Sequence, residues 1–406
     1  MSEKITTFYV SGVWVKPVES KVAFLCGWSY VPWKDLYSAM VVARQLQSSP
    51  SLDTGFMRNS VQRCRLLARL RLQRLQGQET SFLDLLQTFR VTECQDTRDK
   101  VYAPLGLAPA DVIQNITVDY ERPVSEVYLN VIQFLIGKPG QELYFLGYTV
   151  KSQEQSLSLP SWVPNWNDGV VISPLPKLLF ITNEAHGKAI RPYDRRNTLS
   201  QDLKAMKRNV YNASGGARLK AFISGAFLGI SGVYCDTIVG IETNNSQENA
   251  RQWSLRSRGQ YSTDESFETA LRRTNAADVQ YDALGRACAR NGSIDFDFLR
   301  KTKAELAVDQ YERQEKMSQA YVAATGLRNL CLTQKGYIGL VPKSTIISDK
   351  VYAFLGGQVL YTLRPDRSDE SRFTYIGECY LHGLMDGEVI TWVNRGTARI
   401  EELVLT

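Results

Sequence analysis

Near its C-terminus the chain reads Gly377-Glu378-Cys379-Tyr380-Leu381-His382-Gly383-Leu384-Met385-Asp386-Gly387-Glu388, a strand-like run that ends in a glycine-rich turn. Turn-forming residues such as Gly356-Gly357 separate this stretch from further short apolar runs upstream. The predicted strands cover residues 329–333, 337–341, 350–355, 358–364 and 373–382. Five short strands at such close spacing predict a small barrel-like or strongly twisted sheet.

Polar side chains on the last of these strands are the candidate catalytic groups. Glu378, Tyr380 and His382 alternate, so they share one face of a strand. A straight strand holds Glu378 and His382 about 13 Å apart, which is too far for a direct acid–base pair. These groups either contact opposite ends of one ligand, or one of them pairs with Arg364 or Asp386 across the turn. The alternative is structural, with His382 and Asp386 stabilising the glycine-rich turn.

Upstream of these strands the pattern changes twice. Strands over 221–241 precede a polar, mostly helical insert over 245–325, which we expect to lie over the neighbouring strands and to be a candidate lid. Near the N-terminus, short strands within 8–26 precede a helix that begins at Ser29. We therefore predict an α+β fold with a helical N-terminal half that contains short strands, a mixed middle region and a small C-terminal β-barrel-like sheet. The expected segments are 1–150, 151–325 and 326–406.

A second informative stretch is Arg98-Asp99-Lys100-Val101-Tyr102-Ala103-Pro104-Leu105-Gly106-Leu107. Asp96 can cap a helix that begins here, and Pro104 should end or kink that helix near its second turn. We interpret Arg98 and Asp99 as a salt-bridged helix start, with substrate binding as the alternative. Downstream, apolar residues recur at helical spacing from Val124 to Leu135, and Gly137 stops this helix.

Composition limits the function classes. The 406 residues carry a net charge of +6, a mild excess that does not call for a nucleic-acid partner. The arginine-rich segment 63–74 is expected to be the solvated face of an amphipathic helix, with an anionic partner as the alternative. No apolar run reaches 18 residues and no signal-peptide pattern is present, so we expect no membrane span and a cytoplasmic protein. Seven cysteines without CxxC spacing and two histidines predict neither a metal site nor a disulfide framework.

Several of these motifs, taken in order, resemble fungal heterokaryon-incompatibility (HET) proteins over about residues 8–392. The matching stretches include Gly12 to Val18, Cys26-Gly27, Arg98 to Leu107, Asp119 to Tyr128, Leu159 to Trp166, Gly336 to Leu340 and Gly377 to Glu388. Members of the family also carry N-terminal blocks with the patterns ALSYxWG and WIDxxCIxQ. This sequence lacks both blocks, so the resemblance implies an N-terminally truncated member. HET proteins are linked to regulated cell death in nonself recognition. The resemblance implies that a chain without those blocks does not perform that role on its own.

The first functional hypothesis is a cofactor-independent tailoring enzyme of fungal secondary metabolism, because short HET-like proteins of this kind resemble ones recruited into natural-product pathways. The reaction would be an isomerisation or cyclisation, including Diels–Alder-type pericyclic chemistry, of an apolar polycyclic, terpenoid or polyketide substrate. Such reactions need a shaped pocket and a few hydrogen-bond donors. No cofactor is expected, because dinucleotide, P-loop and HExxH motifs are lacking.

The expected substrate-binding residues combine aromatic and charged groups. Trp162 and Trp166 lie in the stiff Leu159 to Trp166 segment, where they are either core residues or the wall of an apolar pocket. The remaining candidates are Tyr9, Trp28, Tyr30, Arg364 and Asp386. The expected partner is a small apolar metabolite, bound by a monomer or homodimer.

The alternative hypotheses involve no catalysis. A truncated HET protein would act as a regulatory or partner-binding module in nonself recognition, because loss of the N-terminal segment exposes apolar surface that a partner would cover. The third hypothesis is a degenerate family member that has no activity of its own. A closed apolar pocket favours the enzyme, and an exposed apolar face near residues 8–40 favours the binding module.

Overall fold

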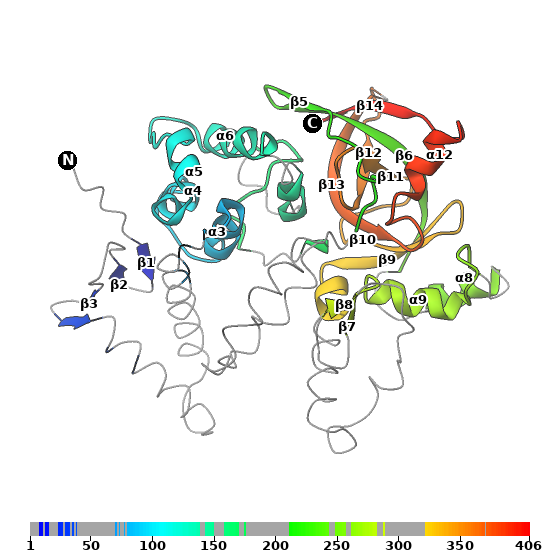
Figure 1. The fold of residues 1–406 in the computed structure, drawn as a ribbon, viewed down its shortest axis with the longest axis horizontal. Coiled ribbons are helices and arrows are strands. Elements are labelled where there is room, and N and C mark those ends of the chain that lie inside the picture. Colours follow the sequence, from blue (N-terminus) through cyan, green and yellow to red (C-terminus); the bar gives the residue numbers. More distant parts are fainter. Residues whose placement is uncertain are drawn as a thin grey trace, which may run out of the picture. The chain divides into compact units, whose positions relative to one another are not determined.

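The computed structural model describes residues 8–10, 13–15, 23–26, 29–32, 35, 38, 70, 73, 77, 79–138, 143–149, 158–169, 174–175, 211–242, 248–256, 261–281, 287–288, 321–369 and 371–406. The chain divides into two compact units. The first, called the helical unit here, comprises 1–134 and 165–171. The second, called the ring unit, comprises 135–164 and 172–406 (Figure 1). The three segments expected from the sequence stay a prediction.

The helical unit begins with a small antiparallel sheet. Its strands, in sheet order, are β1 (Phe8–Val10), β2 (Val13–Val15), β3 (Ala23–Cys26) and β4 (Ser29–Pro32). The helix predicted from Ser29 is wrong over these residues, because β4 pairs with β3 in an unbroken register from Ala23↔Pro32 to Cys26↔Ser29. The apolar residues at helical spacing, from Trp33 to Met40, follow β4, so the predicted helix was begun too early in the chain. Helical backbone is found later, at Asp35 and Ser38.

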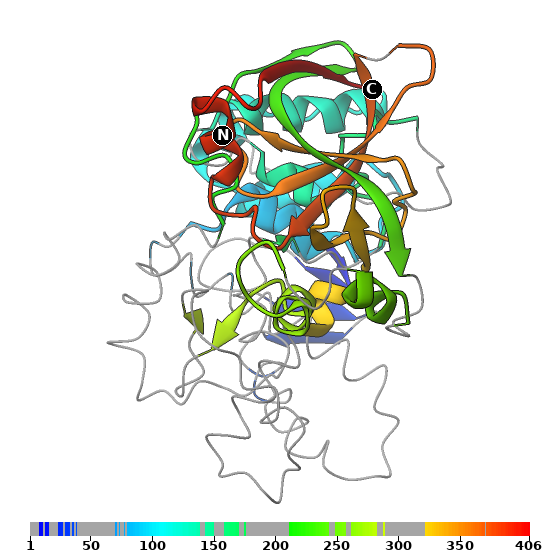
Figure 2. The same ribbon diagram turned by 90° about the vertical axis from the view of Figure 1, so that its right-hand side faces the viewer.

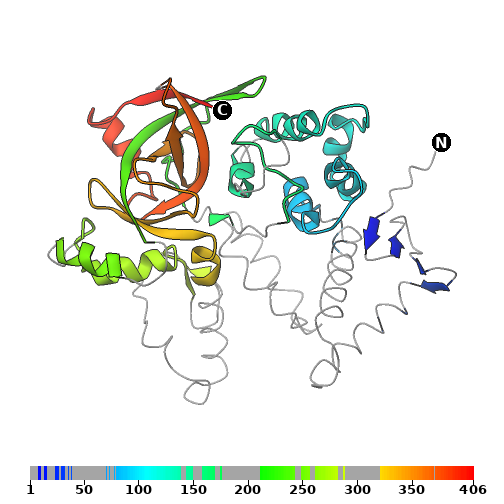
Figure 3. The same ribbon diagram turned by 180° about the vertical axis from the view of Figure 1, so that it is seen from behind.

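Between residues 79 and 138 the helical unit consists mainly of short helices and their connections (Figure 3). They are α3 (Phe82–Phe89), α4 (Asp99–Tyr102), the 3-10 helix η1 (Ala103–Leu107), α5 (Ala110–Asn115) and α6 (Val124–Ile136), whose last two residues belong to the ring unit. The prediction for Pro104 is confirmed, because the α-helix ends at Tyr102 and tightens into η1. The helix predicted from Val124 is confirmed as α6, which ends directly before Gly137.

The start of α4 has the structural role expected for Arg98 and Asp99. The Arg98 guanidinium pairs with Asp96 at 2.8 Å and donates to the backbone oxygen of Arg122 at 3.0 Å. Asp99 accepts a hydrogen bond of 2.5 Å from the hydroxyl of Tyr120. These contacts tie the helix start to the chain that precedes α6.

The ring unit is built on eight strands, which confirms the expected α+β class with a barrel-like C-terminal sheet (Figure 1). The strands are β5 (Ala221–Ser224), β6 (Phe227–Glu242), β9 (Arg328–Thr333), β10 (Ile338–Pro342), β11 (Lys350–Phe354), β12 (Leu360–Pro365), β13 (Arg372–Leu381) and β14 (Ile400–Leu405). All five predicted C-terminal strands are present within two residues of their expected ends. The sequence did not predict β14.

Pairing closes the sheet on itself. The order β10-β9-β6-β11-β12-β13 returns to its start because β13 also pairs with β10. The residues predicted as separate strands over 227–238 form the single long strand β6, which curves along one side of the ring (Figure 2). One stretch of β6 pairs with β14 and β11, and its last residues pair with β9. Between Val233 and Ile238, β6 therefore has neither β14 nor β9 beside it on that edge.

Aromatic and thiol side chains fill the interior of the ring. The rings of Phe354 and Tyr361 stack with centroids 4.4 Å apart, and Tyr375 lies 6.2 Å from Tyr361. Cys235, Cys331 and Cys379 are free thiols with no exposed surface. Burial raises the pKa of Cys379 to about 12, so this thiol stays protonated and behaves as a small apolar core residue.

Helices and short strands accompany the ring. The described parts of the expected insert contain α8 (Glu248–Arg256), α9 (Phe267–Asn275), and the pair β7 (Gln280–Tyr281) and β8 (Ala287–Cys288). The 3-10 helix η2 (Tyr144–Tyr148) lies earlier in the chain. The last helix, α12 (Glu388–Asn394), begins where the sequence predicted only a turn. Gly387 makes this possible, because its φ of 95° is a backbone conformation that favours glycine.

Candidate functional site

A buried chain of hydrogen bonds joins two of the three expected catalytic residues to a residue of the insert. The Tyr380 hydroxyl lies 2.7 Å from Nδ1 of His382, and Nε2 of His382 lies 2.6 Å from a carboxylate oxygen of Glu265. Tyr380 and His382 are 1% and 3% exposed. We call these three residues the histidine network. A neutral imidazole satisfies all three groups when Nε2 carries the proton and Nδ1 accepts from the hydroxyl.

Further contacts fasten the insert to the ring at the same place. The Tyr261 hydroxyl donates to the backbone oxygen of His382 at 2.8 Å and accepts from the backbone nitrogen of Ile338 at 3.1 Å. Arg273 on α9 pairs with Glu265 at 3.2 Å and with the buried carboxylate of Asp278 at 2.8 Å. The segment before and along α9 is therefore anchored to the ends of β10 and β13.

The electrostatics of the histidine network favour a neutral imidazole beside a charged carboxylate. Burial lowers the pKa of His382 below its ordinary value, and the hydrogen bond that His382 donates to Glu265 only partly opposes that effect. Burial by itself would raise the pKa of Glu265. Hydrogen bonds from Thr263 and His382, together with the charge of Arg273, outweigh burial and lower it. The network is thus a satisfied structural contact at neutral pH.

Glu378, the third expected catalytic residue, lies in a separate buried environment. One of its carboxylate oxygens accepts from the backbone nitrogen of Leu175 at 2.9 Å. An ideal β-carbon on Gly147 of η2 would lie 2.6 Å from the other oxygen, so this approach requires glycine. Burial lowers the pKa of Arg328, and the negative charge of Glu378 opposes that shift. No hydrogen bond between the described atoms joins Glu378 to His382.

The two charged residues expected to bind substrate have structural contacts. Arg364 forms a bidentate pair with Asp349, with two contacts of 2.9 Å, and also donates to the backbone oxygen of Ser344. Asp349 is 1% exposed, and its hydrogen bonds raise the pKa of Arg364. Asp386 is exposed, and its backbone nitrogen donates to the Glu388 side chain at 2.8 Å. The pairing of His382 with either residue, which the sequence left open, is wrong because Glu265 and Tyr380 occupy both imidazole nitrogens.

The two tryptophans that were expected either in the core or in the wall of an apolar pocket are core residues. Trp162 has no exposed surface and donates from its indole nitrogen to the backbone oxygen of Ala226 at 3.2 Å, within the ring unit. Trp166 has no exposed surface either, and the Arg90 guanidinium lies 5.8 Å from its ring centre within the helical unit. Each tryptophan therefore fills the core of its own unit. For Tyr9 on β1 and Tyr30 on β4 the structure describes the backbone only. Trp28 lies outside the described residues. The same holds for the arginine-rich segment 63–74, apart from residues 70 and 73.

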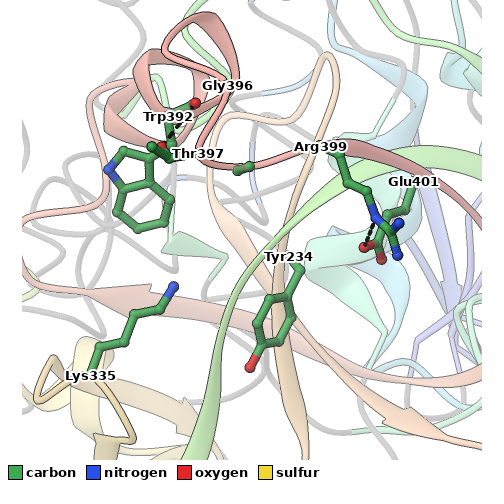
Figure 4. A pocket seen from close by; sticks show the side chains of 8 residues that line it. Tyr234, Lys335, Trp392, Gly396, Thr397, Arg399 and Glu401 are labelled. Atoms are coloured by element: carbon green, nitrogen blue, oxygen red, sulfur yellow. Dashed lines mark hydrogen bonds and ion pairs between the residues drawn. The ribbon is translucent and has the colours of Figure 1, made fainter.

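A surface groove of about 390 Å³ lies in the ring unit where β14 leaves β6 (Figure 4). We call it the lysine groove. Its lining includes Tyr234 on β6, Lys335 in the turn between β9 and β10, Trp392 on α12, Thr397, Arg399, and Glu401 on β14. Lys335 is exposed, and Trp392 is half-buried. Charged and aromatic side chains of the ring unit therefore meet in an accessible groove.

The lysine groove was not predicted from the sequence. Its residues come from three separate stretches of the chain, at 234, 335 and 392–401, and both α12 and β14 were missed as elements. The Gln334-Lys335-Gly336 turn was recognised only as a hairpin signal, because nothing in a turn sequence indicates which side chains its lysine meets. A second groove, of about 420 Å³, lies in the helical unit between the end of α5 and α6 and is lined mainly by uncharged polar side chains such as Asn115, Asn130 and Gln133.

Two negative findings concern the described part of the chain. Among those residues no three His, Cys, Asp or Glu side chains are grouped so that they could hold a metal ion. None of the described helices combines the length and apolar character that a membrane crossing requires.

Comparison with known proteins gives two matches. Residues 252–398 match the family model of the Het-6 beta-barrel domain. The chain is also 25% identical over 347 residues to heterokaryon incompatibility protein 6, OR allele, of Neurospora crassa. That alignment covers 73% of this chain, and the chain spans about half of the relative, 49% of its length. No solved structure matches the chain.

These matches overturn the first functional hypothesis. A secondary-metabolism isomerase or cyclase is wrong as the main interpretation, because both the domain and the relative are those of heterokaryon incompatibility. The family resemblance inferred from the ordered motifs is confirmed. Residues 252–398 are similar to the Het-6 beta-barrel domain, and 73% of the chain is similar to a fungal heterokaryon-incompatibility (HET) protein.

Proposed function

We propose that this chain acts in fungal nonself recognition, as a module that binds a protein partner and so contributes to heterokaryon incompatibility. The function named for the Neurospora relative is carried over to this chain as part of the proposal. Binding, rather than catalysis, is the activity that the described side chains support best.

The observation that carries this proposal is the distribution of polar groups within the matched domain. Residues 252–398 contain Glu265, Tyr380 and His382, which hydrogen-bond to one another in a buried position. The same range contains Lys335 and Trp392, which line a groove at the surface. A surface that presents a cation beside an aromatic ring is typical of binding interfaces, where tryptophan and arginine often dominate the affinity.

A heterokaryon assay tests the proposal. The full chain is expressed in a filamentous fungus that is forced to form heterokaryons with a panel of tester strains, and viable heterokaryotic cells are counted. We expect fewer viable cells in at least one pairing and none of this loss in self-pairings. Unchanged viability in every pairing, with expression of folded protein verified, would contradict the proposed function.

A further inference from the structure

The lysine groove holds an ammonium group in a fixed position. The Lys335 Nζ donates to the backbone oxygen of Cys235 at 2.6 Å and lies 4.8 Å from the ring centre of Trp392 and 5.6 Å from that of Tyr234 (Figure 4). The backbone nitrogen of Lys335 donates to the buried carboxylate of Asp236 at 2.9 Å, which holds the turn itself. A lysine side chain usually loses much freedom when it binds a partner, and here that cost is largely met before binding.

The fixed ammonium keeps donors for a ligand. It has three hydrogens, and the contacts among described residues use one of them, to Cys235. Its cation–π contacts with Trp392 and Tyr234 occupy the ring faces without accepting a directed hydrogen bond. A carboxylate that enters the groove therefore finds unused N–H donors on a group that already carries positive charge.

A second cation lies at the rim of the groove. The side chain of Arg399 is 87% exposed and contacts Glu401 through a single 3.3 Å pair. Exposed pairs of this kind contribute little free energy, so the guanidinium can change partners at low cost. Glu401 has a further partner, because its other carboxylate oxygen accepts from the Tyr352 hydroxyl at 3.3 Å. The groove lining therefore contains two cations, Lys335 and Arg399, and one carboxylate, Glu401. The net charge of the lining is positive.

The aromatic walls suit an apolar side chain between two acidic ones. The Tyr234 hydroxyl is held by Thr237 at 2.7 Å, and its ring packs edge-on against Tyr352 with centroids 5.7 Å apart. Trp392 is half-buried on α12 and is the largest side chain in the groove lining. A volume of about 390 Å³ accommodates a few side chains rather than a whole domain.

We propose that the lysine groove binds an acidic segment of the partner protein, with one carboxylate on Lys335, a second on Arg399 and an apolar side chain against Trp392. This inference rests on the proposed function and names the partner's chemistry. A basic segment is disfavoured, because the aromatic faces that would receive its cation already hold the ammonium of Lys335.

The test is a selection from a random-peptide phage library on the immobilised full-length chain, followed by fluorescence anisotropy with the recovered peptides. We expect recovered sequences to place aspartate or glutamate on both sides of an aliphatic or aromatic residue. Lys335→Gln should weaken binding about tenfold and Arg399→Gln about threefold, because each removes a charge-assisted hydrogen bond. Lys343→Gln, at an exposed lysine outside the groove lining, is the matched control and should leave binding unchanged.

Several outcomes would overturn the inference. These are failure to recover any peptide, recovery of basic or uncharged sequences, and affinities that Lys335→Gln and Arg399→Gln leave at the wild-type value. Displacement of the peptide by inorganic phosphate, at a concentration where chloride has no effect, would assign the groove to a simple anion and also contradict it. The Arg399→Gln variant should fold normally, because the Arg399 side chain is almost fully exposed. A loss of peptide binding by this variant is therefore not explained by misfolding. Because the selection involves no living cells, its failure is distinguishable from failure of the heterokaryon assay.

Discussion

The histidine network and the lysine groove place similar chemical groups in opposite environments. In the network, one hydrogen bond of 2.7 Å joins Tyr380 to His382 and another of 2.6 Å joins His382 to Glu265. These polar groups thus bond to one another. In the groove, Lys335 is exposed beside Trp392, and hydrogen bonds to described residues use one of its three ammonium hydrogens. The difference separates groups that hydrogen-bond within the fold from groups that lie exposed where the strands separate, and the proposed binding uses the exposed ones.

The largest expected effect is on stability, from His382→Ala. Removing the imidazole breaks its hydrogen bonds with Tyr380 and Glu265 and leaves a cavity in a buried site, so the free energy of unfolding should fall by about 3 kcal/mol. Urea denaturation of the full chain measures it. Thr397→Ala in the groove lining is the matched control and should change stability by less than about 0.5 kcal/mol. Equal losses for the two variants would erase the distinction between network and groove.

A second stability effect is expected at Arg364, which the sequence assigned to substrate binding. Arg364→Met leaves the Asp349 carboxylate buried without its ion pair, although the backbone nitrogen of Ile346 still donates to it at 2.9 Å. The expected loss is about 2 kcal/mol, less than for a fully orphaned charge. Arg364→Lys, which keeps the charge but not the bidentate geometry, should lose less. Wild-type stability in Arg364→Met would mean that the pair is only a surface contact.

The pH dependence of stability gives a smaller effect whose sign follows from the two shifts. The pKa of His382 is lowered from 6.5, so the unfolded chain binds this proton first and stability should fall as the pH drops below about 6.5. The pKa of Glu265 is lowered from 4.5, so its contribution is present above about pH 4.5 and is lost on further acidification. Both losses have the same direction. Tyr380, Tyr261, Arg273 and Asp278 are the other ionisable groups that surround the imidazole.

Urea midpoints measured between pH 8 and pH 4 test this. The difference between the wild type and His382→Gln should shrink as the pH falls through the range in which the histidine takes up its proton. A difference that stays constant over that range would mean that folding leaves the pKa of the imidazole unchanged, which would contradict the lowered pKa.

The smallest expected effect on stability is that of Arg399→Gln. With a side chain that is 87% exposed and a single 3.3 Å pair, this arginine should contribute within about 0.5 kcal/mol to the free energy of unfolding. Thermal unfolding of the full chain is the measurement. A loss above that range would place Arg399 in the folded framework and leave the groove with one cation for binding.

Local patterns were enough to predict much of the ring. The five strands over 329–382 were expected because alternating apolar residues and glycine turns are visible in neighbouring residues, and α6 because its apolar spacing spans three turns. The strand β4 was misassigned, because the helix predicted from the apolar residues between Trp33 and Met40 was extended back to Ser29, where pairing with β3 decides the conformation. Similarly, β14 follows from a position beside β6, which lies about 170 residues earlier in the chain.

The candidate site was harder to predict than the fold. The alternation of Tyr380 and His382 placed them together correctly, yet Glu265 comes from the insert 117 residues away, and no local pattern connects the two. Glu378 follows the same alternation but approaches Leu175 and η2 instead. Lys335 meets Trp392 only because the ring closes. Tertiary contacts, rather than local propensity, determine which charged groups are satisfied and which stay available.

One measurement tests the central claim most directly, namely that recognition depends on the lysine groove. The double variant Lys335→Gln with Arg399→Gln is expressed in the heterokaryon assay beside the wild type, and its unfolding free energy is measured on purified protein. We predict stability within about 1 kcal/mol of wild type and complete loss of the effect on heterokaryon viability. A stably folded double variant that still lowers viability as the wild type does would contradict the account.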